Sequence, residues 1–312
     1  MTTTPTSDPM RLGDVDQGQA TAAAEEVSDA QVPDAWWKII WSSKKARVGI
    51  VIVAVYVLVA LFAPLLAPHD PTNSDFVPLA GPSAENWLGT TTNGQDIASQ
   101  LIYGSRVSML VGLFGGVLAT LIALFIGMVS GYAEGTLLDD GLTFVTNVAL
   151  VIPVLPLIIT LVAYAETRGV GLIVAVIAIT SWAGAARGKR SQIITLRNRD
   201  FVTAAKFSGE GTLRIIFREI MPNMTSLVAA GFVGAATGAI GAEAGLAVLG
   251  LGDSRQVSWG TMLYQADAQG AIAQGLFIWV FAPGLVLALL ITAMSFLNFG
   301  VDLLSNPHLR ED

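Results

Sequence analysis

Long uncharged apolar stretches alternate with short charged segments along the chain. A bilayer core about 30 Å thick requires about 20 apolar residues in a helix. Six stretches reach about this length, and they are residues 48–66, 107–133, 141–165, 169–186, 222–242 and 268–301. They lack the alternation of a membrane β-barrel, and a helix pairs all of its backbone groups within lipid. The pattern therefore predicts an all-α polytopic membrane protein with six transmembrane helices.

Proline and glycine modify this picture. Pro153 and Pro156 lie within the third stretch and are expected to kink it, while Pro283 interrupts the sixth. The sixth stretch exceeds one span, so its first part is expected to be a loop or an interfacial helix. Glycines spaced i, i+4 occur twice in the fifth stretch, as Gly234 with Gly238 and as Gly241 with Gly245. This spacing allows close helix packing in lipid, so the fifth span is expected to pack deep in the bundle, although glycine is common in membrane helices generally.

Composition and charge agree with a membrane protein and orient it. The chain is 53% hydrophobic and 13% charged, against about 25% charged residues in soluble domains. A six-span chain has both ends on one side, and that side would hold 14 of the 17 Lys and Arg residues. Because loops rich in Lys and Arg stay on the cytoplasmic side, both termini are predicted to be cytoplasmic. Residues 67–106 would then form an ordered extracytoplasmic loop.

The remaining segments are assigned by composition. Residues 1–34 hold seven acids and one base without apolar periodicity, which predicts a disordered acidic cytoplasmic tail. Tryptophans and lysines predict an interfacial helix at residues 35–47, before a transmembrane domain at 48–304 and a cytoplasmic tail at 305–312. The chain has no cysteine and two histidines, which excludes disulfides and disfavours a His-based metal site. We expect no bound cofactor, no metal and no nucleic acid.

A charged segment between the fourth and fifth spans, within a cytoplasmic loop at about 187–221, does not resemble a simple connection. It predicts a helix over residues 200–208, a break at residues 209–211, and a second helix with Thr212 as its N-cap. In the second helix Leu213, Ile216, Phe217 and Ile220 share one face, Arg214 and Arg218 share another, and Pro222 is expected to end it. Such an amphipathic elbow fits a helix lying on anionic lipid, a generic positive loop, or a docking surface for a cytoplasmic protein.

The elbow resembles the cytoplasmic signature of ABC-importer permeases, Glu-Ala-Ala, three residues, Gly, then after nine residues Ile-x-Leu-Pro. The matches are Ala204, Ala205, Gly209 and Pro222, and Ile220 lies one position after the family's Ile. Thr203 stands where the family has Glu, and Met221 stands where it has Leu. The spacing is intact, so the resemblance implies that a coupling-helix elbow forms here.

Three more stretches resemble the dipeptide/oligopeptide permeases of this class. They are "WLGTTTNGQDIASQLIYGSRVSMLVG" at 87–112, "EAGLAVLGLGDSRQVSWGTML" at 243–263 and "APGLVLALLITAMSFLNFGVDLLSNPHLR" at 282–310. Thr91, Gln95 and Asn306 depart from the family pattern. Within that family the chain resembles the second type of permease subunit.

The resemblance implies a transporter of several subunits. This chain would pair with a homologous second permease in the lipid of a bacterial inner or plasma membrane, and two ABC ATPase subunits would bind the cytoplasmic elbows. An extracytoplasmic binding protein would deliver the substrate, peptides first, with oligosaccharide, nickel or glutathione as alternatives. The implied ATPase-coupling residues are Ala204, Ala205, Gly209, Leu213, Arg214, Ile216, Phe217, Arg218, Ile220 and Pro222.

Two observations test the rival classes. The chain lacks a P-loop, since "GAARGKR" at 184–190 has the wrong spacing, so ATP hydrolysis is expected in partner subunits and not here. An ion-coupled secondary transporter would need charged groups at mid-bilayer, and these spans have almost none. Glu243 is the acid embedded near a span, and it is assigned to a structural role or to the pathway.

Overall fold

The computed structural model describes residues 40–166, 169–253 and 255–305. Its regular elements are helices, and an isolated bridge joins Thr90 to Asp96. The helices are α3 (Lys44–Leu61), α4 (Ala63–Leu66), α5 (Ile97–Tyr132), α6 (Leu137–Val151), α7 (Val154–Ala163), α8 (Val170–Ser181), α9 (Ala183–Arg197), α10 (Asp200–Phe207), α11 (Thr212–Arg214), the π-helix η1 (Ile215–Ile220), the 3₁₀ turn η2 (Met221–Met224), α12 (Thr225–Val248), α13 (Trp259–Ala268) and α14 (Phe277–Ser305). The acidic tail, the start of the interfacial helix and the C-terminal tail after Ser305 lie outside the described residues.

The candidate membrane spans number three to five. Three helical runs are long and apolar enough to cross a bilayer, and they are α5, Thr212–Val248 and α14. The bent pairs α6–α7 and α8–α9 raise the number to five if each pair is one span. The 18-residue helix α3 begins with Lys44, Lys45 and Arg47, which shortens its apolar part. The expectation of six spans stays a prediction, because it requires α3 to cross as well.

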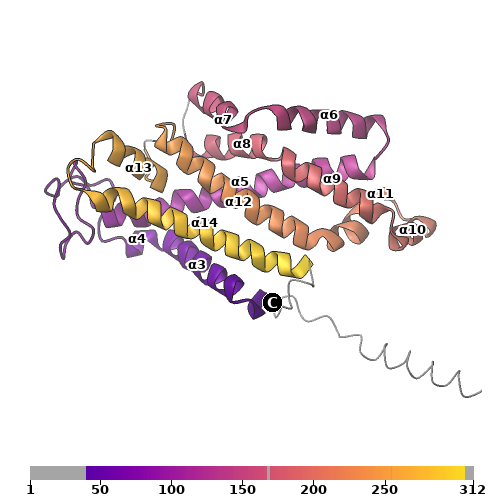
Figure 1. The fold of residues 1–312 in the computed structure, drawn as a ribbon, viewed down its shortest axis with the longest axis horizontal. Helices are drawn as coiled ribbons and strands as arrows, with labels where there is room; N and C mark the ends of the chain where they lie inside the picture. Colours follow the sequence, from indigo (N-terminus) through magenta and orange to yellow (C-terminus); the bar gives the residue numbers. More distant parts are fainter. Residues whose placement is uncertain (1–39, 167–168, 254, 306–312) are drawn as a thin grey trace, which may run out of the picture.

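Helix α5 is the centre of the bundle. It packs against α3, α8, α9 and α12, while α14 lies beside α3 and α12 (Figure 1). A methyl group added at Gly116 of α5 would come within 2.9 Å of the Ala236 Cα atom of α12. This close approach needs glycine, because any larger residue would push the two helices apart.

One face of α12 is open. Around Gly234, Gly238, Gly241 and Gly245, no atom in the described part of the chain lies within 4 Å of where a β-carbon would stand. Helix α12 packs against α5, α8, α13 and α14, as expected of a span deep in the bundle, but these four glycines do not make the contacts. Helix α12 packs on α5 through Ala236 and related positions and leaves its glycine face uncovered.

Two predicted spans are broken rather than kinked. Helices α6 and α7 meet at 83°, and Ile152 between them is extended, as expected for a residue that precedes a proline. Helices α8 and α9 meet at 45° around Trp182. The prediction that Pro283 interrupts the sixth stretch is wrong, since α14 continues through it. The first part of that stretch is a loop between α13 and α14, as expected.

The two ends of the bundle differ in structure. Figure 1 shows α10 and α11 at one end of the long helices, and α4 and α13 at the other. The loop that precedes α5 is held by buried polar groups: the Asp96 carboxylate accepts hydrogen bonds from the Ser99 N–H at 2.8 Å and from Asn86 Nδ2 at 3.1 Å. Asp96 also caps α5, which therefore begins ten residues before the predicted apolar stretch.

Candidate functional site: the elbow and an open cavity

The elbow, residues 200–224, begins with a helix that is closed by a glycine turn. Gly209 follows α10 with φ +77°, a backbone conformation that favours glycine. Its N–H donates to the Lys206 carbonyl at 3.0 Å, and the Glu210 N–H donates to the Ala205 carbonyl at 3.1 Å. These two bonds are the Schellman motif, which satisfies carbonyls at the end of a helix. The motif fixes the direction in which the chain leaves α10.

The second half of the elbow differs from the sequence prediction. Gly211 rather than Thr212 is the N-cap, and Pro222 lies within η2 without ending the helical run, which continues into α12. Only Thr212–Arg214 is α-helical before the chain becomes a π-helix over Ile215–Ile220. In a π-helix the backbone hydrogen bonds join residue i to residue i+5, so Ile215 and Ile220 come onto one side.

This π-helix divides the predicted apolar face. Ile216 and Ile220 are buried, and together with Ile215 they belong to an apolar cluster with residues of α5, α9 and α10. Leu213 and Phe217 are exposed, at 71% and 56%. The interpretation that all four residues form one docking ridge is wrong, because an α-helical period does not apply here.

Three large apolar side chains of the elbow are more than half exposed. Phe207 of α10 is 87% exposed, and we call Phe207, Leu213 and Phe217 together the outer elbow face. Arg214 and Arg218 are exposed as well, and Arg214 Nε lies 3.3 Å from Glu210 Oε1. Sequence reasoning did not select Phe207, although its position two residues before Gly209 was a usable signal.

The family-motif positions have simple surroundings. Ala204 is exposed and Ala205 is partly buried, where its carbonyl takes part in the glycine turn. The Thr203 hydroxyl, which stands in place of the family's Glu, donates to the Arg199 carbonyl within α10 at 3.3 Å. The turn at Gly209 is therefore closed by backbone groups, without a carboxylate at position 203.

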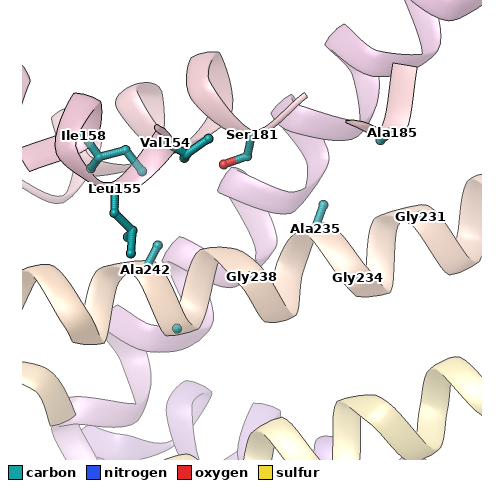
Figure 2. A pocket seen from close by; sticks show the side chains of 11 residues that line it. Val154, Leu155, Ile158, Ser181, Ala185, Gly231, Gly234, Ala235, Gly238 and Ala242 are labelled. Carbon is teal, nitrogen blue, oxygen red and sulfur yellow. The ribbon is translucent and has the colours of Figure 1, made fainter. Parts of the chain in front are cut away.

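An open cavity of about 580 Å³ lies against the glycine face of α12. Figure 2 shows Leu155 extending from α7 toward Ala242 of α12, with Ser181 at the end of α8. The lining residues come from α7, α8, α9 and α12, and they are Val154, Leu155, Ile158, Ser181, Ala185, Gly231, Gly234, Ala235, Gly238, Gly241 and Ala242. The lining side chains are small or apolar, and none of them is charged.

The sequence prediction missed this cavity wall. Val154, Leu155 and Ile158 read as ordinary span residues, and they line the cavity because the 83° break at Pro153 turns α7 toward α12. The two prolines of this stretch were the available signal. Glu243 is buried in α12, contacts the side chain of Ser258 beside α13, and is not among the cavity-lining residues.

Comparison with known proteins identifies the class. A family model described as the binding-protein-dependent transport system inner membrane component matches residues 121–310. The chain belongs to this family. A second model, the N-terminal TM domain of oligopeptide transport permease C, matches residues 34–82 of the permease.

Curated relatives match most of the permease. The dipeptide transport system permease protein DppC of Bacillus subtilis is 30% identical, covering 88% of this chain and 85% of the relative. The di/tripeptide transport system permease protein DppC of Pseudomonas aeruginosa is 33% identical, covering 88% and 92%. A solved structure, the MetNI methionine ABC transporter in inward-facing conformations, has a TM-score of 0.47 and 14% identity, covering 61% of this chain and 96% of that chain.

Proposed function

We propose that the permease forms the translocation path of an ATP-driven importer for peptides. Its family and the peptide named in each of the two curated relatives support this substrate class. The second family model, from oligopeptide transport permease C, supports the same class and the second type of permease subunit. Neither the oligosaccharide, nickel and glutathione alternatives nor ion coupling is favoured by these relatives.

The outer elbow face is the observation that carries the mechanism. Phe207, Leu213 and Phe217 are exposed on a segment whose other side is held in the bundle by buried isoleucines. Apolar side chains on a fixed helical turn suit a groove on a partner, and neighbouring Arg214 and Arg218 add charge that orients it. We place the ATPase subunits on this face, where closure of the nucleotide-bound pair would push the elbow as a rigid unit.

The remaining partners follow from the open surfaces. We place a homologous second permease against the uncovered glycine face of α12, where it would close the cavity of about 580 Å³. An extracytoplasmic binding protein would act at the opposite end from the elbow, beside α4 and α13. In this arrangement the chain has six spans, both termini and the elbow lie on the cytoplasmic side, and ATP hydrolysis takes place in the partner subunits.

The test is an aspartate placed on the outer elbow face. Phe217→Asp should weaken ATPase binding by about 2 kcal/mol, or about 30-fold, as expected for an aromatic anchor in a docking groove. Co-purification of the ATPase with the permease pair measures binding, and peptide uptake into cells measures function. Thr195→Asp adds the same charge at an exposed position of α9 and should leave ATPase binding and uptake unchanged. ATPase binding and uptake at wild-type levels in Phe217→Asp would contradict the proposal.

A further inference from the structure

Helices α6 and α9 are joined by a two-pronged ion pair. Arg190 Nε lies 2.8 Å from Asp139 Oδ1, and Arg190 Nη2 lies 2.7 Å from Asp139 Oδ2. The Asp139 side chain is 4% exposed, and that of Arg190 is 29% exposed. Ser130 of α5 donates to Asp139 Oδ1 at 2.6 Å, and Thr143 donates to the same oxygen at 3.1 Å. Charge-assisted bidentate pairs fix both distance and orientation, so this contact sets how α6 lies on α9.

Two further arginines of α9 bond to α6 and to the residues just before it. Arg187 Nη2 donates to Asn147 Oδ1 of α6 at 2.6 Å, two turns after Asp139. Arg197 Nη1 donates to the Tyr132 carbonyl at 2.7 Å, and Arg197 Nη2 lies 3.4 Å from Glu134 Oε2. Apolar burial contributes little here, because most large side chains of α6 are exposed. Polar contacts from α9 therefore hold α6 and the turn that precedes it.

The two helices lead to different functional parts. After α9 the chain enters α10 within three residues, and α10 begins the elbow. After α6 the chain bends by 83° at Ile152 and Pro153 and enters α7, which lines the cavity with Val154, Leu155 and Ile158. Asp139 and Arg190 thus join the segment that leads to the elbow to the segment that leads to the cavity wall.

We propose that Asp139 and Arg190 are positioning residues that couple elbow movement to the cavity wall. Arg190 carries the displacement of α9 to Asp139, α6 moves with α9 as one body, and the bend at Pro153 transfers this movement to α7. The inference rests on the proposed function, because it requires an ATPase that moves the elbow. It differs from a purely structural role in its consequence: weakening the pair would separate ATP hydrolysis from uptake while the complex stays assembled.

The first experiment compares hydrolysis with uptake in membrane vesicles that contain the full complex and the loaded binding protein. Asp139→Asn removes the charge at constant size, and Arg190→Lys keeps the charge but loses the two-pronged geometry. Each should lower peptide uptake per ATP by about tenfold, within the usual range of coupling between distant sites. Asp140→Asn, the neighbouring exposed carboxylate, should leave the ratio unchanged. An unchanged ratio in both test variants, or failure of both complexes to assemble, would overturn the inference.

The second experiment measures the movement itself. The chain has no cysteine, so spin labels attach at Val145→Cys on α6 and Ser191→Cys on α9, both exposed. The label–label distance should stay the same with and without ATP, and Asp139→Asn should make it broad or ATP-dependent. A distance that changes with ATP in the otherwise unaltered complex would overturn the inference. If that complex does not couple ATP to peptide uptake at all, the proposed function fails instead, which separates the two failures.

Discussion

The backbone N–H of Glu210 donates a hydrogen bond to the carbonyl of Ala205 at 3.1 Å, across the left-handed residue Gly209. This bond joins the end of α10 to the start of the next helical run without any side chain. The elbow direction is therefore set by a backbone turn, and the residue at its centre has no β-carbon. Substitution of that residue tests the turn directly.

Gly209→Ala should loosen the elbow. A β-carbon in the left-handed region costs about 1 to 2 kcal/mol, although the described residues leave open space around this position. Hydrogen exchange of the amides at 200–222 should accelerate, and the ATPase should stimulate uptake less. Gly188→Ala is the matched control, because this exposed helical glycine of α9 also has open space and gains helix propensity. Equal rates of amide hydrogen exchange in the two variants would contradict the role of the Gly209 turn in holding the elbow.

Gly116→Ala should destabilise the bundle where α5 meets α12. The added methyl would stand 2.9 Å from the Ala236 Cα atom, so one backbone must move, at a cost of about 1 to 3 kcal/mol. Thermal unfolding of the purified permease in detergent measures this loss. Gly171→Ala on α8 meets no described atom within 4 Å and should unfold as the wild type does. An unshifted midpoint for Gly116→Ala would show that the helices do not touch there.

Gly238→Leu should block the cavity without unfolding the chain. No described atom lies within 4 Å of a β-carbon at Gly238, so the larger side chain enters open space that the cavity provides. Peptide uptake should fall to background while thermal stability is retained. Gly171→Leu, outside the cavity lining, serves as the control for bulk alone. Normal uptake by Gly238→Leu would contradict the prediction that peptide passes through the cavity.

Glu243→Gln should preserve transport, because an amide of the same shape keeps the contact with Ser258. Glu243→Ala should lower stability by about 1 to 3 kcal/mol, since it removes a buried polar contact with Ser258. Uptake assays and thermal unfolding of both variants separate the two roles. If Gln abolishes uptake while the protein remains stable, the carboxylate acts in the pathway and not in a structural role.

The sequence by itself determined the helical class and the family, and it predicted the break in the helix at residues 209–211. Uncharged apolar runs predict helices, because a helix pairs its own backbone groups within lipid. Gly209 predicts a turn with positive φ, a conformation that residues with a β-carbon disfavour. These properties are local, so they can be read from neighbouring residues. The spacing of the elbow motif, with the other three stretches, sufficed for the family resemblance.

Tertiary structure alone decided which side chains are buried, which are exposed and which distant residues meet. The π-helix turned Ile216 and Ile220 inward while Phe217 stayed exposed, because packing against α5 and α9 overrides an α-helical period. The bend at Pro153 brought α7 to the glycine face of α12 and created the cavity. Asp139 and Arg190 lie 51 residues apart, and no local pattern links them. Contacts between distant segments depend on how helices pack, which a linear pattern does not record.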